Sequence, residues 1–130
     1  MAVRPTVPRS VHADESYCGT IARVELQNFM CHEDFSIDLI PHVNFIVGRN
    51  WIGKSAILVG ISVCLGGKMS FTQRGDVARD LIRRGQAQAV LRVHFRNGGA
   101  EAFMPERFRG GVVVVERVLS AGGASVYRLK

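Results

Sequence analysis

Residues 48–55 read Gly48-Arg49-Asn50-Trp51-Ile52-Gly53-Lys54-Ser55 and match the pattern G-x-x-x-x-G-K-[ST]. The mostly apolar residues 43–47 run directly into this segment and predict a short buried strand. Residues 54–65 are apolar on nearly all sides and are followed by two glycines, which predicts a buried helix. A strand before the pattern and a helix after it are the context in which it indicates a phosphate-binding loop.

A loop of this kind holds a nucleotide phosphate mainly through its backbone. Its N–H groups form a concave anion site, and the helix adds its positive N-terminal end. Lys54 is expected to neutralise the β- and γ-phosphates, and the Ser55 hydroxyl to join the coordination shell of Mg²⁺. The alternative is a glycine turn beside an ordinary core helix. The expected phosphate-binding residues are Gly48, Arg49, Asn50, Trp51, Ile52, Gly53, Lys54, Ser55 and Ala56.

The predicted helix carries small residues at every fourth position, namely Ala56, Gly60 and Cys64. Such a stripe lets a helix backbone lie close to a sheet. Gly60 costs about 1 kcal/mol relative to alanine in a helix interior, and close approach would compensate for that cost.

Alternation of apolar and polar residues predicts further strands around this unit. Residues 21–29 and 34–39 read as two half-buried strands that pair antiparallel. Residues 77–84 predict a short helix, and residues 87–96, 112–118 and 126–129 predict strands separated by glycine pairs. The expected fold class is α/β, with mixed or antiparallel sheets around the helix that follows the loop. Residues 1–19 are expected to form a mobile tail and residues 20–130 a single lobe.

Length and charge limit the function further. The chain has 130 residues and a formal net charge of +6, enough for one small domain. Residues 1–50 hold 4 basic and 6 acidic residues, whereas residues 51–130 hold 13 and 5, so the positive charge lies in the second part. Such an excess favours a polyanionic partner. No segment reaches the roughly 18 apolar residues that span a bilayer, and the three cysteines are expected to be free thiols.

Several spaced segments together resemble the N-terminal ATPase lobe of structural maintenance of chromosomes (SMC) proteins. The first of them resembles the sixth member of that family in particular. In chain order the segments are Asn28-Phe29-Met30-Cys31-His32, residues 43–48, Gly53-Lys54-Ser55-Ala56, Leu65-Gly66-Gly67-Lys68 and Thr72-Gln73-Arg74-Gly75.

This resemblance implies an ABC-type P-loop NTPase head with ATP and Mg²⁺ as cofactors. It also implies partners, namely DNA, a complementary head lobe and the fifth SMC family member, and a nuclear, chromosomal role in DNA repair by homologous recombination. Since ATP would be closed between two heads, these residues alone are not expected to hydrolyse it. Two alternatives are a non-catalytic truncated fragment that acts as a structural or DNA-binding module, and an independent small P-loop enzyme.

Trp51 departs from the family pattern, which usually has glycine at this position. If the backbone there requires a positive φ, a tryptophan is strained by about 1–3 kcal/mol. Three interpretations remain open: the ring turns outward and the loop relaxes, the loop has decayed and binds nucleotide poorly, or the ring stacks on a base.

Arginines of the second part form the candidate DNA surface. Arg74 follows the predicted helix and is the expected nucleotide or DNA contact. Basic groups spaced along one face can reach successive phosphates, and the alternative is a solvated face with scattered arginines. The expected DNA-backbone contacts are Arg79, Arg83, Arg84, Arg92 and Arg96.

Overall fold

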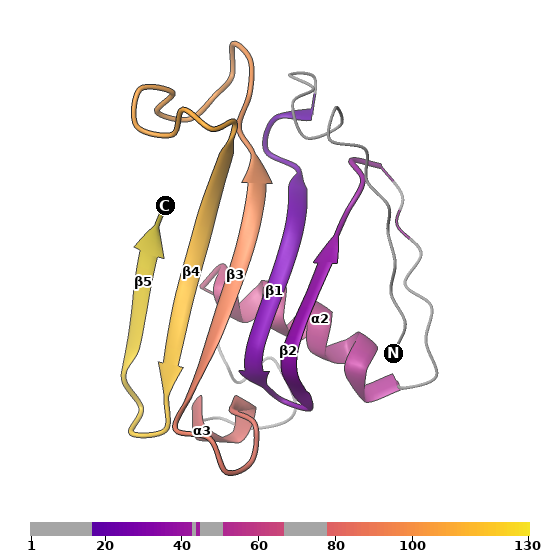
Figure 1. Ribbon diagram of the computed structural model, residues 1–130, viewed down its shortest axis with the longest axis vertical. Helices are drawn as coiled ribbons and strands as arrows, with labels where there is room; N and C mark the ends of the chain where they lie inside the picture. Colours follow the sequence, from indigo (N-terminus) through magenta and orange to yellow (C-terminus); the bar gives the residue numbers. More distant parts are fainter. Residues whose placement is uncertain (1–16, 43, 45–50, 67–77) are drawn as a thin grey trace.

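The computed structural model describes residues 17–42, 44, 51–66 and 78–130 (Figure 1). Its centre is a five-stranded sheet with the order β2-β1-β3-β4-β5, in which every neighbouring pair is antiparallel. The strands are β1 (Ile21–Phe29), β2 (His32–Asp38), β3 (Gln88–Arg96), β4 (Val112–Ser120) and β5 (Ser125–Leu129). The helices are α2 (Trp51–Cys64) and α3 (Ala78–Leu81).

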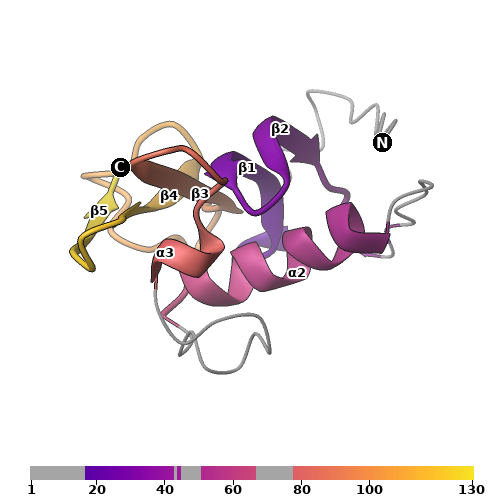
Figure 2. The same ribbon diagram turned by 90° about the horizontal axis from the view of Figure 1, so that it is seen from below.

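Helix α2 lies along one face of the sheet, as Figure 2 shows from below. The register places Leu26 of β1 beside Leu91 of β3, and Val24 beside Val93. These four side chains are fully buried and belong to one core cluster with Val63 and Cys64 of α2. Apolar residues at every second position of β1 and β3 therefore form the floor on which α2 rests.

Most of the predicted elements are present, with shifted ends. Strand β1 has the predicted bounds, whereas β2 begins at His32, before the predicted residue 34. Helix α2 begins at Trp51 rather than residue 54, and α3 is shorter than the helix predicted over residues 77–84. The predicted strand at residues 43–47 lies outside the described residues, apart from Asn44. Residues 1–16 of the predicted tail also lie outside them.

Candidate functional site

Helix α2 is seated on the sheet through its small residues. Ala56 and Cys64 are fully buried, and Gly60 lies directly above β1. A Cβ atom added at Gly60 would lie 2.7 Å from Cδ2 of Leu26 and 3.5 Å from Cε1 of Phe29. The close approach predicted from the four-residue repeat is therefore confirmed.

The C-terminal end of α2 is fastened to β4. Arg117 donates from Nη1 to the carbonyl oxygen of Val63 over 2.7 Å, and its guanidinium lies 4.7 Å from the ring centre of Tyr127. The Cys64 thiol donates to the carbonyl oxygen of Val115 over 3.3 Å. Burial raises the pKa of Cys64 to about 11, so this thiol is neutral at physiological pH.

The N-terminal end of α2 carries the second half of the predicted phosphate loop. Gly48, Arg49 and Asn50 lie outside the described residues, and residues 51–54 are described by their backbone alone. Trp51 is the first residue of α2, so its backbone is helical and the positive φ considered above does not occur there. Ser55 is half-buried, and the first turn of α2 has no acidic residue.

The side of α2 that faces away from the sheet is apolar and exposed. Leu58 is 70% exposed and Leu65 is 48% exposed. These residues lie two helical turns apart, with the exposed Ser62 between them. Within the described part of the chain, no element covers this side of the helix (Figure 2).

The hairpin between β1 and β2 contains the segment that resembles the SMC family. Asn28 and Met30 both have positive φ, at 52° and 54°. Met30 donates its backbone N–H to Leu81, and Arg83 donates its backbone N–H to Asn28, each over 2.7 Å. This hairpin is therefore joined to the end of α3, which places Arg83 next to it.

The structure separates the arginines that were expected to contact DNA. Arg74 and the side chain of Arg79 lie outside the described residues. Arg84 is exposed, and Arg83 has one ion-pair contact, 4.0 Å from Glu33. Arg92 is held between Glu116, at 2.6 Å, and Glu25, at 3.5 Å.

The prediction that Arg96 contacts DNA is wrong, because this side chain is buried. Its residue is only 1% exposed, and its guanidinium donates to Thr20 Oγ1 and to the carbonyl oxygens of Ile21 and Leu39. Loss of solvent lowers its pKa. Arg92 and Arg96 do lie on the same face of β3, but Arg96 ties β3 to β1 and to the end of β2, and it is removed from the candidate DNA contacts.

Charged residues of all five strands form an ion-pair network on the face of the sheet opposite α2. Glu116 lies at its centre, 2.6 Å from Arg92, 3.0 Å from Lys130 and 3.7 Å from Arg128. Burial alone would raise the pKa of Glu116, but hydrogen bonds from Arg92 and Lys130 outweigh it and leave this pKa below its ordinary value. This network was not predicted, because its members come from strands that become neighbours only in the fold.

The family model described as an AAA domain matches residues 23–129. The chain belongs to the AAA domain family. This AAA domain is 46% identical over 116 residues to Structural maintenance of chromosomes protein 6 of Dictyostelium discoideum. The aligned residues make up 89% of this chain and 10% of that protein. With the protein of the same name in Schizosaccharomyces pombe, identity is 41% over 112 residues, or 86% of this chain and 10% of the relative.

A solved structure supports the same conclusion for the fold. It comes from work on ATP-driven dimerization and DNA-stimulated activation of SMC ATPases, and it superimposes with a TM-score of 0.73 at 28% identity. The match covers 85% of this chain and 69% of that one. The resemblance to SMC proteins and the P-loop head fold, both predicted from the sequence, are thus confirmed. This AAA domain spans about a tenth of the length of the curated relatives.

Proposed function

We propose that this chain is the ATP-binding N-terminal lobe of an SMC head. The observation that carries the proposal is the position of the G-x-x-x-x-G-K-[ST] pattern, which runs into the N-terminal end of a helix seated on an SMC-type sheet. Backbone N–H groups of residues 48–56 would hold the phosphates, and Lys54 would neutralise their charge.

Ser55 fits the role of a magnesium ligand. Its hydroxyl is a hard oxygen donor of the type that Mg²⁺ prefers, and the residue is half-buried near the start of α2. Since no acidic residue lies in the first turn of α2, nothing there repels a phosphate. Bound Mg²⁺ would supply charge neutralisation of the phosphates.

Hydrolysis by this lobe alone is not expected. The exposed Leu58 on α2 and Leu65 directly after it support a complementary head lobe that covers this side of the helix. In the proposed complex the lobe acts with the fifth SMC member on nuclear chromosomes, in DNA repair by homologous recombination. The arginines proposed to approach DNA are Arg74, Arg79, Arg83 and Arg84. Arg92, also expected there, is left out of the proposal because Glu116 and Glu25 hold its guanidinium.

A second candidate function is a non-catalytic module with impaired ATP binding. Trp51 favours it, because a large side chain replaces the glycine that the family usually has within the phosphate loop. Both candidates share the fold, and they differ in nucleotide affinity.

Calorimetric titration of the purified chain with ATP and Mg²⁺ distinguishes the two candidates. We expect weak binding that Lys54→Ala abolishes and Trp51→Gly strengthens. Arg107→Ala is the matched control, because it removes an exposed cation outside the phosphate-loop pattern, from the segment between β3 and β4, and should leave affinity unchanged. Equal affinity in all four proteins would refute the phosphate-loop proposal, and no binding by any protein except Trp51→Gly would favour the non-catalytic module.

DNA contact needs its own experiment. We expect the chain to bind a short DNA duplex with an affinity that falls as salt concentration rises. The double variant Arg83→Ala/Arg84→Ala should weaken binding and flatten this salt dependence. Arg107→Ala/Arg109→Ala removes the same charge from the loop between β3 and β4, at the opposite end of the sheet from α3 (Figure 1), and should have a smaller effect. Equal effects of the two double variants would indicate non-specific attraction to a basic protein.

A further inference from the structure

Strand β5 forms one edge of the sheet, and half of its backbone groups point away from β4. Val114 and Lys130 exchange two backbone hydrogen bonds of 2.9 Å. Such exchanges recur at every second residue of an antiparallel pair. The N–H and C=O groups of Ser125, Tyr127 and Leu129 therefore point out of the sheet, and among the described residues no strand pairs with them.

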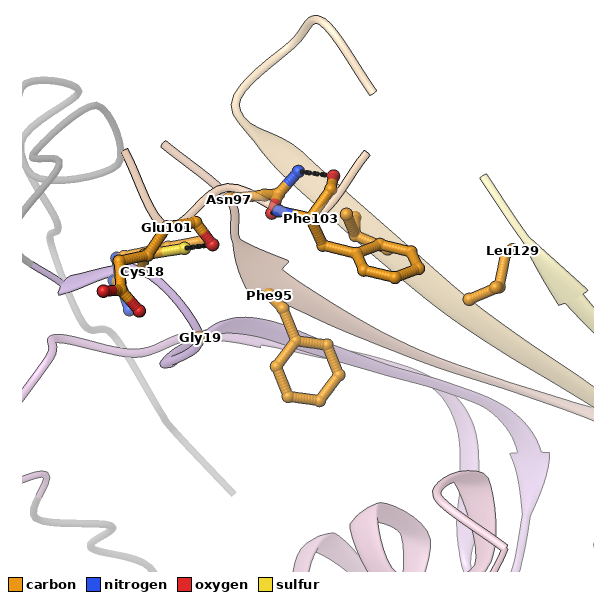
Figure 3. Close-up of a pocket in the computed structure, with 9 residues that line it drawn as sticks. Cys18, Gly19, Phe95, Asn97, Glu101, Phe103 and Leu129 are labelled. Atoms are coloured by element: carbon orange, nitrogen blue, oxygen red, sulfur yellow. Dashed lines mark hydrogen bonds between the residues drawn. The ribbon is translucent and has the colours of Figure 1, made fainter. Parts of the chain in front are cut away.

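On the face of the sheet that carries α2, the surface next to β5 is hollowed and largely apolar. One cavity of about 500 Å³ lies there, and Figure 3 shows Phe95, Phe103 and Leu129 around it. A second cavity of about 460 Å³ is lined by the apolar or aromatic Val115, Tyr127 and Leu129 and, in addition, by Arg107 and Arg128. Leu129 lines both cavities, so they lie next to each other along β5. About half of the surface of Tyr127 and of Leu129 is exposed.

The opposite side of the edge is cationic. Arg128 and Lys130 project there, with side chains that are 61% and 51% exposed. Both contact Glu116, which also binds Arg92 at 2.6 Å. Arg92 also contacts Glu25, whereas Arg128 and Lys130 contact Glu116 alone. These two cations with one carboxylate leave an excess of positive charge next to β5.

This combination selects one kind of occupant. A small apolar ligand would fill a cavity but would leave the outward N–H and C=O groups of β5 without partners. A second copy of the chain, paired edge to edge, would bring another Arg128 and Lys130 to the same surface, in a molecule with a net charge of +6. An extended segment with acidic side chains can form hydrogen bonds with the outward backbone groups of β5 and ion pairs with Arg128 and Lys130.

We propose that β5 is a docking edge for an extended polypeptide segment of a partner, in which apolar residues alternate with Asp or Glu. The segment pairs with the outward groups of Ser125, Tyr127 and Leu129 and extends the sheet by one strand. Residues on the same face of a strand are about 7 Å apart, so successive apolar side chains enter the two cavities. The acidic side chains between them face Arg128 and Lys130.

A labelled synthetic peptide tests the proposal by fluorescence anisotropy. The probe alternates Val and Glu over about eight residues, and its matched control has Lys in place of every Glu. We expect the Glu peptide to bind the whole chain at least about tenfold more tightly than the Lys peptide at low salt. The double variant Arg128→Gln/Lys130→Gln should abolish the difference between the two peptides.

Substitution of Leu129 separates the backbone's contribution to peptide affinity from that of the side chain. Leu129→Pro removes an outward N–H and leaves the hydrogen bonds to β4 intact, so binding should fall at least about tenfold. Leu129→Val keeps the N–H and should retain most of the affinity, with equal melting temperatures showing that both variants fold. Failure of the folded chain to bind the Glu peptide, or equal binding by Leu129→Pro and Leu129→Val, would overturn the proposal. Sedimentation showing a dimer that Leu129→Pro dissociates would assign the edge to a second copy instead.

Discussion

Arg117 of β4 donates a 2.7 Å hydrogen bond from Nη1 to the backbone carbonyl of Val63, near the last residue of α2. Arg117 is nearly buried, and its Nε also donates to the Ser125 hydroxyl over 2.7 Å. One side chain therefore connects the helix, β4 and the start of β5.

Removal of this side chain should destabilise the lobe. Arg117→Ala removes the charged donor from the Val63 carbonyl, which then keeps only the Gly66 N–H at 3.2 Å, and it also removes the hydrogen bond to Ser125. We expect the free energy of unfolding to fall by about 2–3 kcal/mol. Urea unfolding followed by circular dichroism measures this quantity. Arg107→Ala is the control, because Arg107 is exposed and its loss should cost less than about 0.5 kcal/mol. A similar loss in both variants would contradict the fastening role of Arg117.

Gly60→Ala should also destabilise the lobe, although alanine is the better helix former. The gain in helix propensity is about 1 kcal/mol, but the new Cβ would meet Leu26 Cδ2 at 2.7 Å within a packed core. Overpacking of this kind costs about 1–3 kcal/mol. We therefore expect a lower melting temperature than in the wild type. Ser62→Ala, on the exposed side of the same helix, should leave the melting temperature equal or higher, and a melting temperature of Gly60→Ala above the wild type would refute the close contact.

Glu116 should make the fold sensitive to acid. Its pKa is lowered in the folded state, because hydrogen bonds from Arg92 and Lys130 outweigh the effect of burial. A lowered pKa means that the unfolded chain takes up the proton first as pH falls. Stability contributed by Glu116 is therefore complete at neutral pH and is lost as pH falls from about 5 through the folded pKa.

Unfolding curves at pH 7 and pH 4 test this dependence. The wild type should lose more stability between the two pH values than Glu116→Gln does, since glutamine does not titrate. At pH 7 the variant should be the less stable protein, because it leaves Arg128 and Lys130 without their carboxylate and Arg92 with Glu25 alone. Parallel loss of stability in both proteins would show that other carboxyl groups dominate acid unfolding.

Cys64 should produce the opposite dependence at alkaline pH. Its pKa is raised from 9.0 to about 11, so its contribution to stability is complete below about pH 9 and is lost as pH rises through 11. Two pKa units correspond to about 2.7 kcal/mol. Cys64→Ala should lose less stability than the wild type between pH 8 and pH 10.5. A thiol reagent at neutral pH should modify the exposed Cys31 in the folded chain and reach Cys64 only after unfolding.

Local periodicity explains which parts of the fold were predictable. Alternation predicts β1, because the face with Ala22, Val24 and Leu26 is buried until Asn28, whose φ is positive, interrupts it. The repeat of Ala56, Gly60 and Cys64 predicts the face of α2 that meets the sheet, since a helix returns to the same side every four residues. The phosphate-binding residues were predicted from the pattern and its context, and they stay a prediction.

The buried arginines were missed for a different reason. Arg96 binds atoms of residues 20, 21 and 39, and Arg117 binds Val63, which is 54 residues away. Strand order decides these contacts, and local sequence does not contain it. One signal was available: Arg117 lies between Val115 and Leu119 at alternate positions, so alternation puts it on the apolar face of β4.

Side-chain volume, rather than hydrophobicity, decides how α2 is rotated about its own axis. The helix is apolar on nearly every side, so burial of apolar surface would favour several rotations about equally. Only the side with Ala56, Gly60 and Cys64 is narrow enough to approach β1 as closely as it does. The rotation that follows directs Leu58 away from the sheet. A single methyl group at Gly60 would therefore disturb the geometry of both faces of the helix.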